Sequence, residues 1–587
     1  MNCFVDKILF VDLTSRQILT APLNQEWIED YWGCWGLALR YYWDEVSPTV
    51  DPLSPENVLV LMTGALSGTL TPLSGRMCLV SKSPQSGTVF QSNVGGGISN
   101  ELKFAGYDGI VVRGKASSPV YLKIEDDRVS LEDAGDLWGK GIFETDKLLQ
   151  TAIGSEEAKS LVIGPAGENL VKFSCIGSEA YRQMGRSGGG ALFGSKNLKG
   201  IVCRGTGGVR VADMGAFLKT IDHYKKTSLL DEENLWAYTD GTPILMEATN
   251  EMGIHPTRNF TAGMNDSIQP LATDAIKAAK LGDRACASCI LACGKFTDVN
   301  GAQMEGPEYE TLNMGGSNCE VNDLEQVILF NRLCDDLGMD TISCGNIMAM
   351  AMDMTEKGRK DFKLPFGPSA EYLKVVTEIG TLSTERGRDL AQGSRWLAET
   401  YDSQDLSTEV KGLELPAYDP RGNYGMGLSY AVSERGACHM RAFTVFSEAP
   451  LDLDVQARDV VDAQNLNAVK WSLGFCDVWA NISADIMADI LSVGLGKTVT
   501  AAELLRAGER IWNLGRLFNL RAGITAEDDK LPQKILNQGL KKGANDGRVF
   551  SAEDFEYAKQ TFYRLRQWDP EGIPAIEKLA ELGLDQY

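Results

Sequence analysis

The sequence predicts an α+β protein in which a sheet-rich N-terminal domain forms a base and two mainly helical domains follow. Up to about residue 205, short apolar runs rich in β-branched residues alternate with Gly and Pro turns, a pattern typical of strands. Beyond them, apolar residues recur at helical spacing. A chain of 587 residues is long enough for several cores. We predict domains over 1–208, 209–415 and 416–587.

The first domain is predicted to open with two strands around the Thr14-Ser15 turn, followed by a helix over 24–45. Six further strand-like runs follow it: ENVLVLMTG, GRMCLVSKS, YDGIVVRGK, PVYLKIED, KSLVIGP and KGIVCRG. In the second domain, DLEQVILFNRLCDDLG predicts a helix that ends at a glycine, and SCGNIMAMAMDMTEKG predicts the next one. We expect loops over 413–430, before the helices DVVDAQNLNAVKWSLG and AAELLRAGERIWNLGRLFNLRAG of the third domain.

Composition excludes several classes of function. The net charge of −23 disfavours nucleic-acid binding, and no run of 18 apolar residues predicts a membrane span. The N-terminus, MNCFVDKILFVDL, lacks the features of a signal peptide, so we expect a cytoplasmic protein. Thirteen scattered cysteines do not fit a disulfide framework. With three histidines, a metal site must rely on thiolates, carboxylates or a cofactor.

The segment CASCILACGK holds Cys286, Cys289 and Cys293 within eight residues. A close set of cysteines with one remote cysteine is typical of an iron–sulfur cluster, whereas zinc usually takes two pairs. The alternative is three core cysteines on one helix face, since positions i, i+3 and i+7 share a face. The spacing does not select the fourth ligand, and the candidates are Cys319, Cys334, Cys344, Cys438 and Cys476.

Three glycine-rich segments of the first domain combine glycine with arginine or asparagine, in the runs SGRMCLVSKSPQSG, QSNVGGGISN and YRQMGRSGGG. Glycine lets backbone amides approach an anion closely, and arginine adds bidentate charge. None of the three matches the dinucleotide-binding or the P-loop pattern. Glycine-rich turns are the alternative, but three such segments in one domain favour a cofactor that carries phosphate.

Two further patterns remain ambiguous from residue type alone. The segments DDLGMD (335–340) and WSLGFC (471–476) both end a predicted helix with glycine and are followed by more helix, so they are either ordinary C-caps or supports for a planar ligand. EGPEYETL offers Glu305, Glu308 and Glu310 as acid–base groups, and RGACHMR offers His439. For the glutamates, the alternative is a solvated face without a catalytic role. For His439, the alternative is a buried histidine with satisfied hydrogen bonds.

Taken in order along the chain, these segments resemble the aldehyde:ferredoxin oxidoreductase family of tungsten–pterin enzymes. The resemblance runs from the first strand to about residue 585 and rests on these motifs: DPLSPENVLVLMTGALSGT, SNVGGGISNELKFAGYDGIVVRGKA, IGPAGENLVKF, GRSGGGALFGSKNLKGI, C-x2-C-x3-C, EGPEYET, DDLGMDTIS, LELPAYDPRG, RGACHMR, LGFC and GERIWNLGRLFNLRAG.

The resemblance implies a function and a set of cofactors. It implies interconversion of aldehydes and carboxylates, with electrons passing through a [4Fe-4S] cluster to ferredoxin or to a dedicated iron–sulfur subunit. The cofactors would be tungsten or molybdenum held by two pterins, the cluster, and Mg²⁺ bridging the pterin phosphates. The N-terminal sheets would form the base for the cofactor, and the two helical domains would cover it.

The resemblance also implies roles for individual residues. The cluster ligands would be Cys286, Cys289, Cys293 and Cys476. The pterins and their phosphates would contact Arg76, Asn93, Gly95, Gly96, Arg182, Gly185, Arg186, Gly188, Asp335, Gly338, Met339, Asp340, Arg441, Gly474 and Phe475. Glu310 and His439 would move protons beside the metal, and His255 in GIHPTRNF is a candidate for the substrate channel.

The chain departs from the family pattern at three places. Trp471 stands where the second pterin motif has aspartate; its indole N–H only donates, and Asp477 is a nearby acceptor. Trp35 stands where an N-terminal G-x-R-G pattern has arginine. The E-x-x-H pattern that bridges two subunits through iron is absent, and the aligned residues read LFNR (329–332). A homodimer is compatible with this sequence, but not through that iron site.

Two other functions compete with an aldehyde oxidoreductase. A catalytic subunit like that of benzoyl-CoA reductase would use the same cofactors to reduce an aromatic-ring thioester. A non-catalytic electron-transfer subunit would keep the cluster alone. The segments EGPEYET and RGACHMR favour the aldehyde enzyme over both.

Overall fold

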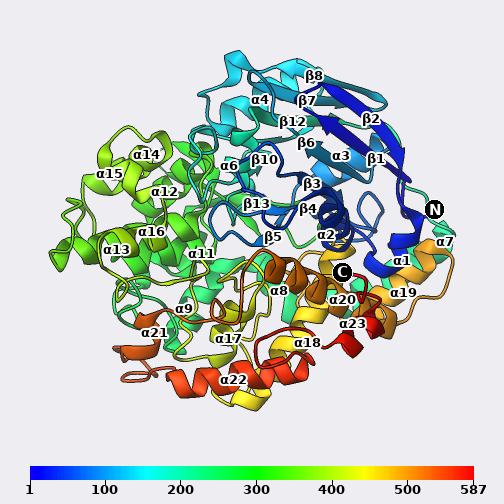
Figure 1. Cartoon of the computed structure of the whole chain (residues 1–587). Coiled ribbons are helices and arrows are strands. Elements are labelled where there is room, and N and C mark those ends of the chain that lie inside the picture. Colours follow the sequence, from blue (N-terminus) through cyan, green and yellow to red (C-terminus); the bar gives the residue numbers. More distant parts are fainter. Residues whose placement is uncertain (300) are drawn as a thin grey trace.

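Two six-stranded sheets make up the N-terminal part of the chain (Figure 1). The structure is a computed structural model that describes residues 1–299 and 301–587. In spatial order, the first sheet contains β2 (Gln17–Pro22), β1 (Lys7–Asp12), β6 (Gly109–Arg113), β3 (Leu59–Thr63), β4 (Met77–Lys82) and β5 (Val89–Val94). The second contains β11 (Arg182–Met184), β10 (Ile176–Ser178), β9 (Lys159–Val162), β12 (Leu198–Arg204), β7 (Val120–Glu125) and β8 (Arg128–Asp133). Only the pairs β1–β6 and β7–β12 are parallel.

Strand β3 shows why these runs are apolar throughout. Side chains alternate between the two faces of a strand. Leu59 and Leu61 share a core with the second sheet, while Val60 and Met62 belong to a core with helices from the two ends of the chain. A strand buried on both faces reads as a continuous apolar run. The six predicted runs and the opening pair of strands are confirmed as strands.

The helices follow the strands in most of the predicted places. Those up to residue 208 are α1 (Ile28–Tyr31), α2 (Cys34–Glu45), α3 (Ile98–Phe104), α4 (Ile142–Ile153), α5 (Pro165–Glu168) and α6 (Gly189–Ser195). Those from 209 to 415 are α7 (Met214–Tyr224), α8 (Glu232–Thr239), α9 (Leu245–Glu251), α10 (Thr273–Ala279), α11 (Tyr309–Thr311), α12 (Leu324–Leu337), α13 (Thr341–Glu356), α14 (Glu371–Thr381), α15 (Glu385–Leu390) and α16 (Ser394–Thr400). Those that follow are α17 (Tyr424–Val432), α18 (Leu453–Ser472), α19 (Ala484–Leu495), α20 (Ala501–Arg521), α21 (Gln533–Asn537), α22 (Ala552–Leu565) and α23 (Ile576–Leu582).

Four details differ from the sequence prediction. The helix expected over 24–45 is broken between α1 and α2, where Trp32 adopts a left-handed φ of 60°. The expected loop over 413–430 contains the strand β17 (Leu413–Glu414), which pairs with β16 (Glu409–Val410), and the start of α17. After α18 the next helix begins only at Ala484, so WSLGFC leads into a loop. The middle of the chain also carries a three-stranded sheet of β13 (Lys280–Arg284), β14 (Gly294–Val299) and β15 (Ala302–Glu305), which was not predicted.

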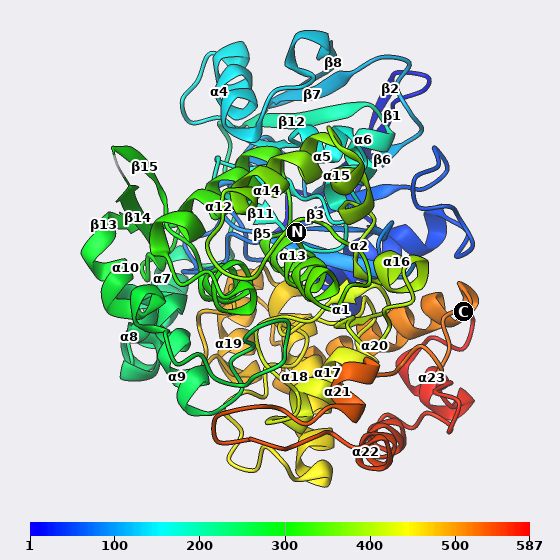
Figure 2. The ribbon, with the colours of Figure 1, turned by 90° about the vertical axis from the view of Figure 1, so that its left-hand side faces the viewer.

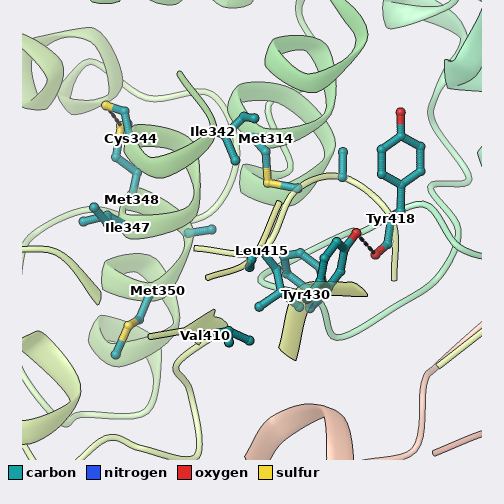
Figure 3. Close-up of a cluster of buried hydrophobic side chains, with 14 of the residues drawn as sticks. Met314, Ile342, Cys344, Ile347, Met348, Met350, Val410, Leu415, Tyr418 and Tyr430 are labelled. Carbon is teal, nitrogen blue, oxygen red and sulfur yellow. Dashed lines mark hydrogen bonds between the residues drawn. The ribbon is translucent and has the colours of Figure 1, made fainter. Parts of the chain in front are cut away.

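The middle helices enclose a core rich in methionine, built on α13 (Figure 3). Met348 and Met350 lie on α13 beside Ile347, and Met314 lies in the same core. Unbranched methionine fills irregular gaps, which suits a helix that is buried on nearly all sides. The hydroxyl of Tyr430 donates to the backbone oxygen of Tyr418 at 3.0 Å and ties α17 to the chain before it. This core supports the segments that carry Glu310 and Asp340.

The C-terminal helices close over the first sheet. Helix α2 packs against β3 and β4 on one side and against α18 and α20 on the other. In Figure 1, the N-terminal strands lie at the top, helices α12 to α16 at the left, and α18 and α22 at the bottom, while α7 lies beside α19. Figure 2 shows the same chain turned by 90°. The α+β class is confirmed, and the domain boundaries near 208 and 415 stay predictions. Among the described residues, no helix has the length and apolarity that a membrane crossing requires.

Candidate active site

One cavity of about 440 Å³ collects most of the residues singled out in the sequence. The predicted residues on its wall are Arg76, Asn93, Gly95, Arg182, Gly185, Arg186, Cys286, Cys289, Cys293, Glu310, Asp335, Met339, Asp340, His439, Arg441 and Cys476. Five further predicted positions do not line the cavity: Gly96, Gly188, Gly338, Gly474 and Phe475. The wall therefore joins strand ends of both sheets, the cysteine segment, and the ends of α12 and α18.

The three clustered cysteines lie in the loop between β13 and β14, not on a helix. The helix-face alternative is thus wrong, because Ser288 and Ala292 adopt left-handed φ values that interrupt any helix. All thirteen cysteines are free thiols. No group of His, Cys, Asp or Glu within 1–299 and 301–587 is arranged to hold a single metal ion. Ligands of a cluster each bind a different iron and therefore lie farther apart than ligands of one ion.

Arg76 connects the remote cysteine to the clustered ones. Its Nη2 donates to Cys476 Sγ at 2.8 Å. Burial opposes its charge, but Cys476 and Cys286 outweigh burial and raise the pKa of the guanidinium. A Cβ atom at Gly95 would lie 2.8 Å from Cys286 Sγ, so only glycine allows this close approach. Of the five candidates for the fourth ligand, Cys476 alone lines the cavity with the other three.

The glycine loops are positioned by contacts to the cysteine segment and to the helices. Gly96 has a φ of +86°, and its oxygen accepts from the Ala287 amide at 3.1 Å. Arg186 donates to Asp340 Oδ2 at 3.2 Å and to the backbone oxygens of Ala437 and Glu414. Arg182 pairs with Glu305, and that partner outweighs burial to raise the pKa of the guanidinium. The arginines are thus held in place by protein partners and still border the cavity.

The junction of α12 and α13 presents a carboxylate on each side of a glycine turn. Gly338, with a φ of +80°, ends α12, as the sequence predicted. Asp340 then caps α13 by accepting from the Ile342 amide at 3.1 Å. Asp335 accepts from Gln183 and Asn331, both at 3.2 Å, and burial raises its pKa well above the usual range.

The end of α18 docks onto the first sheet. The amide of Arg76 donates to the oxygen of Gly474 at 3.1 Å, and Gly474 has a φ of +94°. A Cβ atom there would lie 2.8 Å from Ser67 Oγ. These contacts place Cys476 at the cavity wall, with its amide donating to the oxygen of Leu73 at 2.8 Å. Trp471, on the last turn of α18, and Asp477, just after the Gly474 turn, also line the cavity.

Glu310 and His439 face each other with unpartnered atoms. His439 Nδ1 lies 3.5 Å from Glu310 Oε1, and neither atom has a hydrogen bond among the described residues. The Ala417 amide donates to Glu310 Oε2 at 2.9 Å and fixes the carboxyl. Burial raises the pKa of Glu310 to about 8. Burial, reinforced by Arg186 and Arg435, lowers the pKa of His439 to about 3, so its imidazole is neutral.

Two expectations about single residues are corrected. His255 does not line the cavity; it is fully buried, and Thr249 Oγ1 and Ser317 Oγ bond its two ring nitrogens at 3.0 and 2.9 Å. The expected substrate-channel role is therefore not supported, because a paired core imidazole reaches no ligand. The glutamates of EGPEYETL do not form a solvated face: Glu305 is buried against Arg182, and the Glu310 side chain is only 14% exposed.

Sequence reasoning missed Gln91, Gln183 and Asn331, which also line the cavity. Gln91 accepts from Arg441 Nη1 at 3.0 Å through its side chain. Gln91 and Asn93 lie two residues apart on β5, so the period of two placed both on one face and was the available signal. Nothing local in the sequence marks the other two.

The composition of the wall fits the groups that the family resemblance implies. Four thiols suit an iron–sulfur cluster, and glycine loops with three arginines suit phosphate. A methyl group at Gly185 would meet no described atom within 4 Å, so this backbone borders open space. Together with the Glu310–His439 pair, this wall is typical of a redox enzyme that holds a cluster beside an anionic cofactor.

The chain belongs to the aldehyde ferredoxin oxidoreductase family. Residues 8–205 match the family model "Aldehyde ferredoxin oxidoreductase, N-terminal domain", and residues 220–584 match "Aldehyde ferredoxin oxidoreductase, domains 2 & 3". The chain is 39% identical to the tungsten-containing aldehyde ferredoxin oxidoreductase of Pyrococcus furiosus and 37% identical to that of Thermococcus kodakarensis. Each alignment covers 99% of both chains.

More distant relatives share the fold. The WOR-like subunit of aliphatic sulfonate oxidoreductase from Pyrococcus furiosus is 28% identical over 100% of this chain and 98% of its own. A solved structure of the active site complex BamBC of benzoyl coenzyme A reductase with 1,5-dienoyl-CoA aligns with a TM-score of 0.86 at 24% identity. That alignment covers 100% of this chain and 98% of the other, and it shows the fold alone.

Proposed function

We propose that this protein is a tungsten-dependent oxidoreductase that interconverts aldehydes and carboxylates. The observation that carries the proposal is that Glu310, His439 and the four cysteines share one cavity wall. Identities of 37–39% to tungsten-containing aldehyde ferredoxin oxidoreductases over 99% of the chain support it. The electrons would pass through a [4Fe-4S] cluster to ferredoxin or to an iron–sulfur partner subunit.

The site residues that the sequence predicted divide by chemistry into three sets. Thiolates of Cys286, Cys289, Cys293 and Cys476 would hold the cluster. Arg76, Asn93, Arg182, Arg186 and the backbone of Gly95, Gly96, Gly185 and Gly188 would hold the pterin phosphates and their Mg²⁺. The pterin rings would contact Asp335, Gly338, Met339, Asp340, Arg441, Gly474 and Phe475. When bound, a tungsten or molybdenum bis-pterin would supply a two-electron redox centre beside the cluster.

Glu310 and His439 would handle the protons of the reaction. An aldehyde and water give a carboxylate, two electrons and three protons, so a group beside the carbonyl must accept protons. Glu310 is held by the Ala417 amide through Oε2, which leaves Oε1 free to take a proton. His439 is neutral and can donate one hydrogen bond to the carbonyl oxygen. The burial of both side chains limits competing water at the site.

An assay of protein purified without oxygen tests the proposal. A panel of aldehydes is offered with a viologen dye as electron acceptor, and dye reduction is followed by absorbance. Aldehyde-dependent reduction by the wild-type protein is the expected result. Activity only with a reduced aromatic-ring thioester, or no activity with metals in place, would contradict it.

The runner-up function is a catalytic subunit that reduces an aromatic-ring thioester, as in benzoyl-CoA reductase. Its support is the shared fold at 24% identity, which is weaker than the 39% identity to an aldehyde enzyme. His255 offers it no support, because both ring nitrogens are bonded to core hydroxyl groups away from the cavity. A non-catalytic electron-transfer subunit would have no use for the free Glu310 and His439 atoms on the wall.

A further inference from the structure

The two positions at which the sequence departs from its family motifs are in contact. The rings of Trp35 and Trp471 lie 5.6 Å apart between centroids, at an angle of 44°. Both side chains are buried, in the core that joins the first sheet to the C-terminal helices. The family resemblance implies arginine at the first position and aspartate at the second, which are opposite charges. In this chain an aromatic pair stands at the two positions.

Arg441 and a third tryptophan fix the aromatic pair. The guanidinium carbon of Arg441 lies 5.1 Å from the ring centroid of Trp35 and 5.0 Å from that of Trp471. Such a cation over aromatic faces is attractive, more so when it is buried. Trp512 packs edge-on to Trp35 at 5.1 Å. Gln91 and Glu434 accept from the arginine and orient it. The rings therefore have one well-defined position.

The indole of Trp471 points its only polar atom at Asp477. Its Nε1 donates to Asp477 Oδ1 at 2.8 Å, and Lys470 Nζ lies 2.8 Å from the same oxygen. Both donors engage Oδ1, so Oδ2 keeps its capacity to accept. Asp477 lines the cavity, and the Lys470 ammonium pairs with the Oδ1 side of its carboxylate. A charged acceptor thus lies on the wall six positions beyond the missing aspartate.

We infer that Asp477 takes over the acceptor role that position 471 has lost. Its carboxylate would accept N–H groups of the second pterin, with Trp471 and Trp35 as positioning residues: Trp471 donates to Asp477, and Trp35 packs against Trp471. The inference rests on the proposed function, because it presupposes that the cavity holds two pterins. A carboxylate beside two adjacent N–H donors makes a strong charge-assisted contact, which an indole cannot provide.

The substitution Asp477→Asn tests the inference, because asparagine keeps the shape and removes the charge. The protein is purified without oxygen, and released pterin, tungsten or molybdenum, and iron are measured per chain, with the cluster followed by electron paramagnetic resonance. We expect pterin to fall to about half of the wild-type content, while iron and the cluster signal stay. Asp485→Asn, an exposed carboxylate on α19, is the matched control and should lose nothing.

Substitutions at the tryptophans separate positioning from packing. Trp471→Phe keeps a ring but lacks the N–H, so we expect pterin loss while iron and the cluster signal stay. Trp35→Arg combined with Trp471→Asp should restore pterin in the Asp477→Asn background, because it rebuilds the family pair. Wild-type pterin content in both Asp477→Asn and Trp471→Phe would overturn the inference alone. A wild-type protein without pterin would overturn the proposed function as well.

Discussion

At the scale of single residues, Glu310 is the group that we propose as the base of the reaction. Its Oε2 is fixed by a backbone amide, and its Oε1 is free and faces His439. This arrangement was not accessible from the sequence, in which three glutamates of one motif were equivalent by residue type. The fold separates them: Glu305 pairs with Arg182, Glu308 accepts from Thr242, and Glu310 is left without an ion-pairing cation.

Replacing Glu310 by glutamine should remove turnover and leave the cofactors in place. A positioned general base typically contributes about 10²–10⁴-fold, and glutamine cannot take the proton. The measurement is kcat with an aldehyde and a viologen dye, together with metal content. Glu553→Gln on the exposed start of α22 is the control and should keep full activity. Full activity in the Glu310 variant would refute the role.

The pH dependence of the reaction should report the same group. The pKa of Glu310 is raised to about 8 by burial, so the carboxylate that acts as a base is the minor form below that pH. We expect kcat/KM to rise by about tenfold per pH unit below pH about 8 and to level off above it. His439 adds no limb in this range, because its pKa is lowered to about 3. A rate that falls with rising pH would contradict a base role.

At the scale of elements, many of the residues that line the cavity lie in turns and loops between strands and helices. The strands were predictable because short apolar runs bounded by glycine are typical of buried strands. The end of α12 at Gly338 was predictable because glycine commonly follows the last residue of a helix. The spacing of the cysteine segment also permitted a helix face, which was the alternative to an iron–sulfur site. Its loop is set by contacts to Gly96 and Leu73, which come from a different part of the chain. The strand β13 was missed because KLGDR is polar and mostly exposed.

Two glycines give a matched test of the glycine loops. At Gly185 a methyl group would meet no described atom within 4 Å, so Gly185→Ala should leave the melting temperature of the cofactor-free protein unchanged. If phosphate lies against this backbone, the same variant should hold less pterin. At Gly95 the methyl group would approach Cys286 Sγ to 2.8 Å, so Gly95→Ala should lose iron. Wild-type pterin and iron in both variants would contradict the assignment of these loops.

At the scale of the whole molecule, the first sheet depends on the end of the chain. Val60 and Met62 of β3 share one core with Trp471, Ile511 and Phe518. The contact between Trp35 and Trp471 belongs to this core, and no local pattern could have revealed it. Sequence spacing could not select the fourth cysteine ligand or the two helix ends of the pterin site. The family resemblance implied Cys476 and the ends of α12 and α18.

This shared core predicts that residues 1–208 do not form a stable domain alone. Without the C-terminal helices, one face of β3 and β4 and much of α2 would be exposed to water. We expect the fragment to bind a hydrophobic dye and to lack the cooperative thermal transition of the full chain, followed by near-ultraviolet circular dichroism. A monomeric fragment with a sharp transition would show that the N-terminal sheets are independent.

The most direct test of the account is the metal content of protein purified without oxygen. If four cysteines hold a cubane beside a bis-pterin site, elemental analysis should give about four iron atoms and about one tungsten or molybdenum atom per chain. Cys476→Ala should lose iron, and Cys438→Ala, at a buried cysteine that does not line the cavity, should keep it. Wild-type protein without tungsten or molybdenum, or full iron in the Cys476 variant, would contradict the account.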